Sequence, residues 1–322
     1  MDENQWLTGV PSKGPITLKT ADRVLRSLSN SPFIPKIVHQ TWKTREVPEK
    51  WKSSYDAWTS EEMKQKGWTH YLWTDDDNRA LIATHYSWFL EVYDGYKHPI
   101  QRADAVRPFI LHRYGGVYCD LDIEPKVPDL DRWFESVKHH PVVLSAARSE
   151  HGMGSNHVTN AFMASVPGHE FWVTVWNFLL HPTRRTRAKG FLMKLDYHFD
   201  TLFRTGPGIL TDASKEYGHA RLYIAPSSIL QPFENREDRQ ESVVKVLHGS
   251  SWHKDKKMNL YRAVRACSDH LYWIIGSVIV IVLTAFAMIV VLYRRCRRKS
   301  KDGLSCTRIK DVKKSVGAKI NR

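Results

Sequence analysis

The sequence predicts an α/β domain with a mostly parallel sheet, followed by one membrane-spanning helix. Short apolar segments alternate with amphipathic helical segments between residues 34 and 247, and this pattern is typical of parallel sheets whose strands are joined by helices. A run of 23 uncharged residues, 271–293, comes next. It is long enough to cross a bilayer core of about 30 Å.

The individual elements follow from local signals in the first 250 residues. Strands are expected at 34–39, 68–73, 117–123, 142–146, 222–225 and 243–247. Helices are expected from Pro48, behind Thr74-Asp75, from Pro99 to the Gly115-Gly116 pair, and over 171–180, because Pro favours the first helical turn and Thr or Asp caps it. Since ligands of parallel sheets bind beyond the carboxyl ends of strands, we expect the residues that follow these strands to form the site.

The positive charge of the chain is concentrated at its C-terminus. The net charge is +14, but residues 294–322 hold 12 basic and 2 acidic side chains. The other 293 residues hold 36 basic and 32 acidic side chains. This near balance argues against nucleic acid as a partner of the main domain, and a basic segment beside an apolar run favours contact with the lipid bilayer instead.

The basic segment also predicts a membrane orientation. Arg294 and Arg295 begin a cluster denser than the basic residues before the span, so the tail is expected on the cytoplasmic side and the domain on the lumenal side. Residues 1–33 contain no apolar stretch that resembles a signal peptide. Either the late span translocates the long N-terminal domain, or the natural N-terminus lies further upstream, or the orientation rule fails here.

Two acidic motifs follow predicted strands. Asp75-Asp76-Asp77 precedes a helix, which favours a capping role and an interaction with the helix dipole. Asp120-Leu121-Asp122 follows Gly115-Gly116. On an extended segment, alternate residues point to the same side, so we expect both carboxylates to approach one divalent cation.

The neighbourhood of the second motif resembles the Asp-x-Asp sugar-binding region of glycosyltransferase family 32. Within that family, the similarity is greatest to inositol phosphoceramide mannosyltransferases. It covers roughly residues 33–255 and is carried by Ile34–Lys43, Tyr71–Ile82, Arg102–Asp122, Asn160–Trp172, Thr205–Gly208 and His248–His253. The resemblance implies a GT-A-like nucleotide-binding domain.

The resemblance also implies a role for each matching residue. Asp122 would bind Mn²⁺ or Mg²⁺ directly, and Asp120 would contact the ion through water or hold the ribose. Asp104 would bind hydroxyls of the donor sugar, and Arg107 would bridge the sugar and the phosphates. The alternative for Asp104 and Arg107 is an ordinary surface ion pair, since they lie three residues apart on a helix.

Five further residues are candidates for the rest of the implied site. Trp42 would stack on the nucleotide base, with core packing as its alternative. Ser250 and Trp252 would reach the phosphates from a closing loop. His248 or His253 would complete the metal shell or contact the phosphate.

The implied reaction is the transfer of mannose from GDP-mannose to inositol phosphoceramide or a related glycolipid, with retention of configuration. We expect a Golgi or other endomembrane location. One alternative keeps the fold but uses UDP-galactose or UDP-glucose on a glycan or protein. Another is a non-catalytic membrane lectin or a regulatory partner subunit of another transferase. The expected organisation is an N-terminal extension (1–32), the transferase domain (33–265), the membrane helix (271–293) and the basic tail (294–322).

Overall fold

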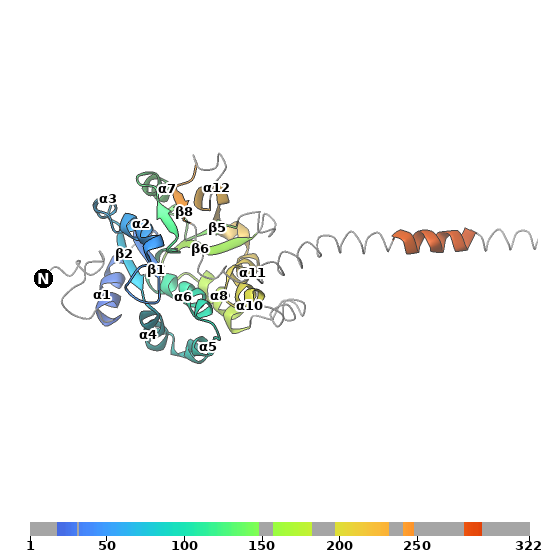
Figure 1. Ribbon diagram of the computed structural model, residues 1–322, viewed down its shortest axis with the longest axis horizontal. Helices are drawn as coiled ribbons and strands as arrows, with labels where there is room; N and C mark the ends of the chain where they lie inside the picture. Colours follow the sequence, from blue (N-terminus) through green and yellow to red (C-terminus); the bar gives the residue numbers. More distant parts are fainter. Residues whose placement is uncertain are drawn as a thin grey trace, which may run out of the picture. The chain divides into compact units, whose positions relative to one another are not determined.

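The computed structural model describes residues 18–30, 32–147, 157–181, 197–231, 241–247 and 280–291. The chain forms two compact units, Met1–Trp252 and His253–Arg322, and Figure 1 shows the elements of the first unit around a central sheet. The predicted Ser250, Trp252, His248 and His253 lie outside the described residues, as does the basic tail.

The described part of the first unit contains one six-stranded sheet with the order β2-β1-β3-β6-β5-β7. Only β6 runs against its neighbours, and the other pairings are parallel. The predicted α/β architecture with a mostly parallel sheet is therefore confirmed. The strands are β1 (Ile37–Thr41), β2 (Thr69–Trp73), β3 (Gly116–Cys119), β5 (Val142–Ala146), β6 (Val158–Ser165) and β7 (Tyr223–Ala225).

Helices cover both faces of this sheet (Figure 1). The larger core lies under α1 (Leu18–Leu28), α4 (Asp75–His85), α5 (Leu90–Asp94), α6 (Pro99–Tyr114), α8 (Phe171–Leu180) and α11 (Pro207–Tyr217). The smaller core lies under α2 (Glu49–Trp58), α3 (Glu61–Gln65), α7 (Asp129–Val137) and α12 (Ser227–Leu230). Side chains alternate along a strand, so Val117 enters the smaller core and Tyr118 the larger one.

Two elements near the site differ from the prediction. The predicted strand 117–123 is wrong, because β3 ends at Cys119 and residues 121–122 form a turn. The chain then enters β4 (Ile123–Pro125), which pairs with β8 (Val244–Val246) in a separate two-stranded sheet. A change of sheet requires a change of direction, and the turn supplies it.

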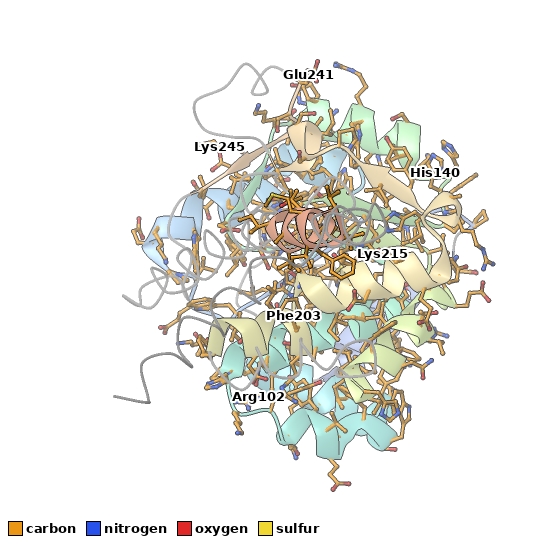
Figure 2. The ribbon with its side chains drawn as sticks, turned by 90° about the vertical axis from the view of Figure 1, so that its right-hand side faces the viewer. Arg102, His140, Phe203, Lys215, Glu241 and Lys245 are labelled. Atoms are coloured by element: carbon orange, nitrogen blue, oxygen red, sulfur yellow. The ribbon has the colours of Figure 1, made fainter. Side chains whose placement is uncertain are left out.

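Elements outside the predicted set complete the unit. Helix α1 packs Val24 and Leu25 into the larger core. Helix α10 (Tyr197–Arg204) lies beside the first turn of α6, where the Gln101 amide donates to Asp200 Oδ2 at 2.8 Å. Figure 2 labels Arg102 of α6 and Phe203 of α10.

The second unit is described only over residues 280–291, which form a helix with exposed apolar side chains. Within the part of the chain that the structure describes, no helix has both the length and the apolar character that crossing a bilayer requires. The rest of the predicted span 271–293 lies outside the described residues.

Candidate active site

A buried ion-pair cluster joins α6 to the residue that follows β3. Arg107 Nη2 lies 2.8 Å from Asp104 Oδ1 and 3.1 Å from Asp120 Oδ1. The side chains of Arg107 and Asp104 are only 6% and 7% exposed. Asp104 and Arg107 therefore form an ion pair, but they form it inside the protein. The alternative of an ordinary surface ion pair is excluded.

The local sequence explains why α6 leads directly into this cluster. The helix begins at Pro99 and ends at Tyr114, and it is capped by Gly115, whose φ of +65° favours glycine. A Cβ at Gly116 would lie 2.5 Å from the Ile37 carbonyl oxygen, so only glycine allows β3 to pass this close to β1. The tight connection lays β3 beside α6, and the residue after β3 thereby meets Arg107.

Three further polar side chains complete the cluster. The Tyr118 hydroxyl donates to Asp120 Oδ1 at 3.0 Å, so the Thr41 hydroxyl, 3.0 Å away, donates to the Tyr118 oxygen. Asn160 Nδ2 donates to Asp104 Oδ1 at 3.0 Å, and its carbonyl accepts from Arg107 Nη1 at 2.9 Å. The sequence analysis gave these residues no role. Their one signal was their place within the stretches 34–43, 102–122 and 160–172, which carry the resemblance to family 32.

Burial dominates the electrostatics of the cluster. It raises the pKa of Asp104 to about 6, although the neighbouring Arg107 opposes the shift. Burial also raises the pKa of Asp120, against the opposing effects of Arg107 and Tyr118. Burial lowers the pKa of Arg107, but Asp120 and the other nearby groups outweigh it and leave the pKa above its ordinary value. Charged groups held against desolvation in this way are typical of functional sites.

The Asp-x-Asp motif lies on the turn after β3 rather than on an extended strand. The Ile123 amide donates to the Asp120 carbonyl at 3.0 Å and closes the turn, while the Asp120 amide donates to the Ala161 carbonyl at 2.9 Å. Leu121 is buried against Trp51 and Leu72. The apolar residue between the two carboxylates therefore anchors the turn to the α2 side of the molecule.

The backbone of the motif's second aspartate lies next to the end of β8. The Leu247 amide donates to the Asp122 carbonyl at 2.7 Å, and Leu247 packs against the cluster around Leu121. Leu247 is the last described residue before the predicted His248–His253 segment. The predicted roles of that segment remain predictions.

Trp42 follows β1 and lies beside the turn. It is half-buried, and its ring meets Trp51 edge-on at 5.0 Å between centroids. The Lys43 ammonium lies 5.7 Å from its ring centroid. The residue thus packs against the core and also retains exposed surface, so the predicted stacking on a base stays a prediction.

The residues present fit a hard divalent cation. Asp120 and Asp122 offer carboxylate oxygens on one tight turn, and Mn²⁺ and Mg²⁺ prefer such ligands. The described residues contain no group of three or more His, Cys, Asp or Glu side chains that could hold a metal. A cation at this turn would therefore draw its further ligands from water, a bound diphosphate or the segment after Leu247.

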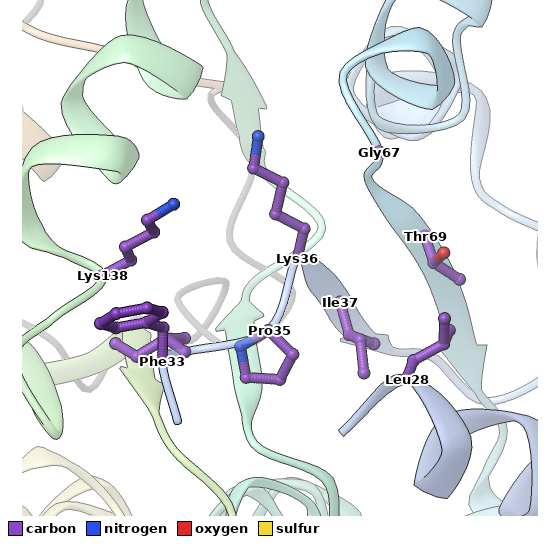
Figure 3. Close-up of a pocket in the computed structure, with 9 residues that line it drawn as sticks. Leu28, Phe33, Pro35, Lys36, Ile37, Gly67, Thr69 and Lys138 are labelled. Carbon is purple, nitrogen blue, oxygen red and sulfur yellow. The ribbon is translucent and has the colours of Figure 1, made fainter. Parts of the chain in front are cut away.

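Other sequence-predicted features have a structural role. Thr74 and Asp77 form a reciprocal capping box at the start of α4, which confirms the capping role of the Asp75–Asp77 motif. Figure 3 shows a pocket of about 280 Å³ beside Lys36, Ile37 and Thr69. It lies at the amino ends of β1 and β2, whereas Asp120 follows the carboxyl end of β3. The pocket is therefore separate from the candidate site.

Comparison with known families agrees with this geometry. Residues 48–139 match the family described as the glycosyltransferase sugar-binding region containing the DXD motif. This match includes Asp104, Arg107, Asp120 and Asp122. The resemblance to the Asp-x-Asp sugar-binding region of glycosyltransferases is thereby confirmed over residues 48–139.

Within the family, the chain is similar to enzymes that act on inositol phosphoceramide. It is 34% identical over 235 residues to inositol phosphoceramide mannosyltransferase 3 of Schizosaccharomyces pombe, with 70% of this chain and 57% of the relative covered. It is 33% identical over 240 residues to a mannosyl phosphorylinositol ceramide synthase of Saccharomyces cerevisiae, with 74% and 56% covered. The chain thus spans little more than half the length of these relatives.

Among solved structures, the ligand-free glycosyltransferase domain of the YGT toxin aligns with a TM-score of 0.40 and 12% sequence identity. The alignment covers 61% of this chain and 81% of that domain.

Proposed function

We propose that this protein transfers mannose from GDP-mannose to inositol phosphoceramide or a closely related glycolipid. The buried Asp104–Arg107–Asp120 cluster at the carboxyl edge of the sheet is the observation that carries the proposal. The names of the similar enzymes support the sugar and the acceptor. Sugar hydroxyls and a diphosphate are the ligands that such a mixture of carboxylates and a guanidinium would recognise.

The chain's own residues would act mainly by positioning and charge. Asp104 would accept hydrogen bonds from hydroxyls of the mannose, and Arg107 would bridge the sugar and the diphosphate. Asp120 and Asp122 would hold Mn²⁺ or Mg²⁺, which supplies Lewis-acid neutralisation of negative charge on a departing diphosphate. With retention of configuration, the acceptor oxygen bonds to the sugar on the face that the diphosphate leaves, and the acceptor proton passes to the departing phosphate oxygen.

The apolar segment after the domain supports a membrane acceptor. We propose that residues 271–293 anchor the protein in a Golgi or other endomembrane, with the domain on the lumenal side and the basic tail on the cytoplasmic side. The uncharged run and the basic cluster that follows it support this topology. An anchor next to the domain would bring the site close to a lipid acceptor.

The proposal is tested with the full chain in detergent, labelled GDP-mannose, Mn²⁺ and inositol phosphoceramide. We expect a mannosylated lipid, and Asp122→Asn should lower kcat by about 10²- to 10³-fold, the scale for loss of one transition-state electrostatic partner. Glu46→Gln, an exposed carboxylate on the loop between β1 and α2, is the matched control and should retain wild-type kcat.

Three outcomes would contradict the proposal. Near-normal activity of Asp122→Asn would show that the turn does not bind a catalytic metal. Turnover of UDP-galactose or UDP-glucose in place of GDP-mannose would show that the proposed donor is wrong. Binding of sugars without turnover of any nucleotide-sugar would identify a lectin or a partner subunit.

A further inference from the structure

Two polar side chains are buried between β1, β2 and the turn that carries Asp120. Gln40 of β1 and His70 of β2 are 0% and 4% exposed. Gln40 Nε2 donates to the Asp120 carbonyl at 3.2 Å, and Gln40 Oε1 lies 2.9 Å from His70 Nε2. A buried polar pair costs free energy unless each of its groups is bonded, so these bonds are the reason the pair is tolerated.

The chemistry of the groups fixes the direction of both bonds. A carbonyl oxygen only accepts, so the Gln40 amide must turn its NH₂ group toward Asp120. The Gln40 side-chain oxygen then faces His70. Since this oxygen can only accept, the His70 Nε2 must carry a proton. Burial lowers the pKa of His70 to about 3, so the ring is neutral and carries one such proton. The result is a single donor chain from His70 through Gln40 to the backbone of the turn.

The position of Gln40 in the sheet explains what this donor chain does. The pairing of β1 with β3 ends at His39 and Tyr118, one residue before Gln40. Beyond that point β3 parts from β1, although Cys119 still pairs with β6, and the Gln40 side chain reaches the Asp120 carbonyl. The same carbonyl accepts the Ile123 amide that closes the turn.

The two ends of Asp120 are held from opposite sides of the sheet. Its carboxylate is bonded by Arg107 and Tyr118 on the α6 side. Its carbonyl is bonded by Gln40, whose partner His70 meets the Tyr55 ring of α2 edge-on at 5.2 Å. With both ends fixed, the peptide of Asp120 has little freedom to rotate, and the direction of the turn toward Asp122 is set.

We propose that Gln40, oriented by His70, is a positioning residue that fixes the Asp120–Asp122 turn so that its two carboxylates are arranged in advance for a divalent cation. The inference rests on the metal role in the proposed function. It adds that a pair of neutral side chains, which touch neither cation nor donor, determines how well that cation binds. Partners of this kind typically change metal affinity by about 10- to 100-fold when they are removed.

The first experiment uses Gln40→Met in the full chain, which keeps the side-chain length and removes both polar groups. Electron paramagnetic resonance of free and bound Mn²⁺, without any donor, should show affinity weakened by at least about tenfold. Hydrogen exchange of the peptide that contains Asp120–Ile123 should become faster, because the Asp120 carbonyl loses its bond from Gln40. Thermal stability should also fall, since His70 keeps a buried, unpaired N–H.

A double variant separates positioning from stability. Gln40→Met with His70→Leu removes the polar pair completely, and replacing both partners by apolar groups is often nearly neutral for stability. We expect the melting temperature to recover toward wild type while Mn²⁺ affinity stays low and exchange stays fast. Parallel recovery of all three would reduce Gln40 to a purely structural residue and overturn the inference.

Ser54→Ala is the matched control. Ser54 Oγ donates to the Ile123 carbonyl at 2.7 Å, and Trp58 Nε1 donates to the same oxygen at 2.8 Å, so one donor remains after the substitution. We expect a modest loss of stability and unchanged Mn²⁺ affinity. Wild-type affinity in Gln40→Met, or no Mn²⁺ uptake by the wild-type chain, would overturn the inference. Mn²⁺ uptake without use of GDP-mannose would contradict only the proposed donor.

Discussion

Helix α6 carries two clusters built from the same residue types, and they differ in burial. At its C-terminal end, Arg113 donates to both carboxylate oxygens of Asp22, at 2.5 and 2.9 Å, and the Tyr114 hydroxyl adds a bond of 2.7 Å. Nearer its start, Arg107 contacts Asp104 and Asp120, and Tyr118 bonds Asp120. The outer Arg113 and Asp22 are 20% and 21% exposed, about three times the exposure of Arg107 and Asp104, whereas Asp120, at the edge of the inner cluster, is 31% exposed.

The pKa values separate the two clusters. Burial opposes ionisation of Asp22, but its bonds to Arg113 and Tyr114 prevail and lower its pKa. At Asp104 and Asp120 burial prevails, and both pKa values rise. The outer cluster therefore stabilises the fold through α1, whereas the inner cluster holds charge at a cost to stability. Such a cost is expected where the charges serve binding and catalysis.

The sharpest test of this contrast replaces each of the two arginines by lysine in turn. Arg107→Lys should lower kcat/KM for GDP-mannose by about 10³-fold, because an ammonium cannot make the forked contacts to two carboxylates and a backbone carbonyl. Arg113→Lys should change kcat/KM by less than about threefold and mainly lower the melting temperature. Equal kinetic losses in the two variants would show that the clusters do not differ in role.

The pH dependence of the free enzyme provides the second test. If ionised Asp104 must accept hydrogen bonds from the sugar, kcat/KM should fall about tenfold per unit below its pKa of about 6. The Asp104→Asn variant should lack this limb of the profile and have a low, flat rate.

Stability should follow the opposite trend. A carboxyl group whose folded-state pKa is raised contributes stability below its unfolded value near 4, and this contribution is lost as the pH rises through about 6. Thermal melts of Asp104→Asn and wild type should therefore converge at low pH. A wild-type activity profile without a limb near pH 6 would contradict this account of Asp104.

A smaller effect is expected from Tyr118→Phe. The substitution removes the bond to Asp120 Oδ1 and leaves the ring in place, so Asp120 loses one of two restraints on its carboxylate. We expect kcat to fall about tenfold with little change in KM, as for other residues that orient a ligand. An unchanged kcat would mean that Arg107 alone orients Asp120.

The smallest effect on activity is expected at the outer cluster. Asp22→Asn should lower the free energy of unfolding by about 1–2 kcal/mol, because it weakens charge-assisted bonds to Arg113 and Tyr114. The kinetic constants should stay within about twofold of wild type. Urea unfolding and steady-state kinetics on the same preparation check both halves of this prediction, and a large kinetic loss would extend the site to the end of α6.

The bounds of α6 and the pairing of Asp104 with Arg107 could be predicted, because both depend on residues that are close together in the sequence. Pro99 and the pair Gly115-Gly116 mark the start and end of α6, and both marks agree with the structure. The i,i+3 spacing of Asp104 and Arg107 predicts that they share a helix face. The resemblance to family 32 singled out the same residues, and the comparisons confirm the resemblance.

The turn at the motif could not be predicted in the same way. Alternation in Val117–Asp122 suits a continuous strand equally well, and the break depends on β8, more than 120 residues later, which pairs with β4. Gln40 and Asn160 were missed for a related reason, because each acts through a contact to a residue distant in the chain. Tyr118 was missed because its bond to Asp120, two residues away, depends on the turn.

The sequence by itself determined the alternation of strands and helices, the short connection from α6 into β3, and the presence of two carboxylates after that strand. These features depend on backbone preferences and side-chain periodicity within a few residues. Only the tertiary structure decided that Arg107 is buried between Asp104 and Asp120, and that Gln40 bonds the carbonyl of the turn. Burial and bond direction depend on what packs around a group, and long-range packing is not encoded in any short segment.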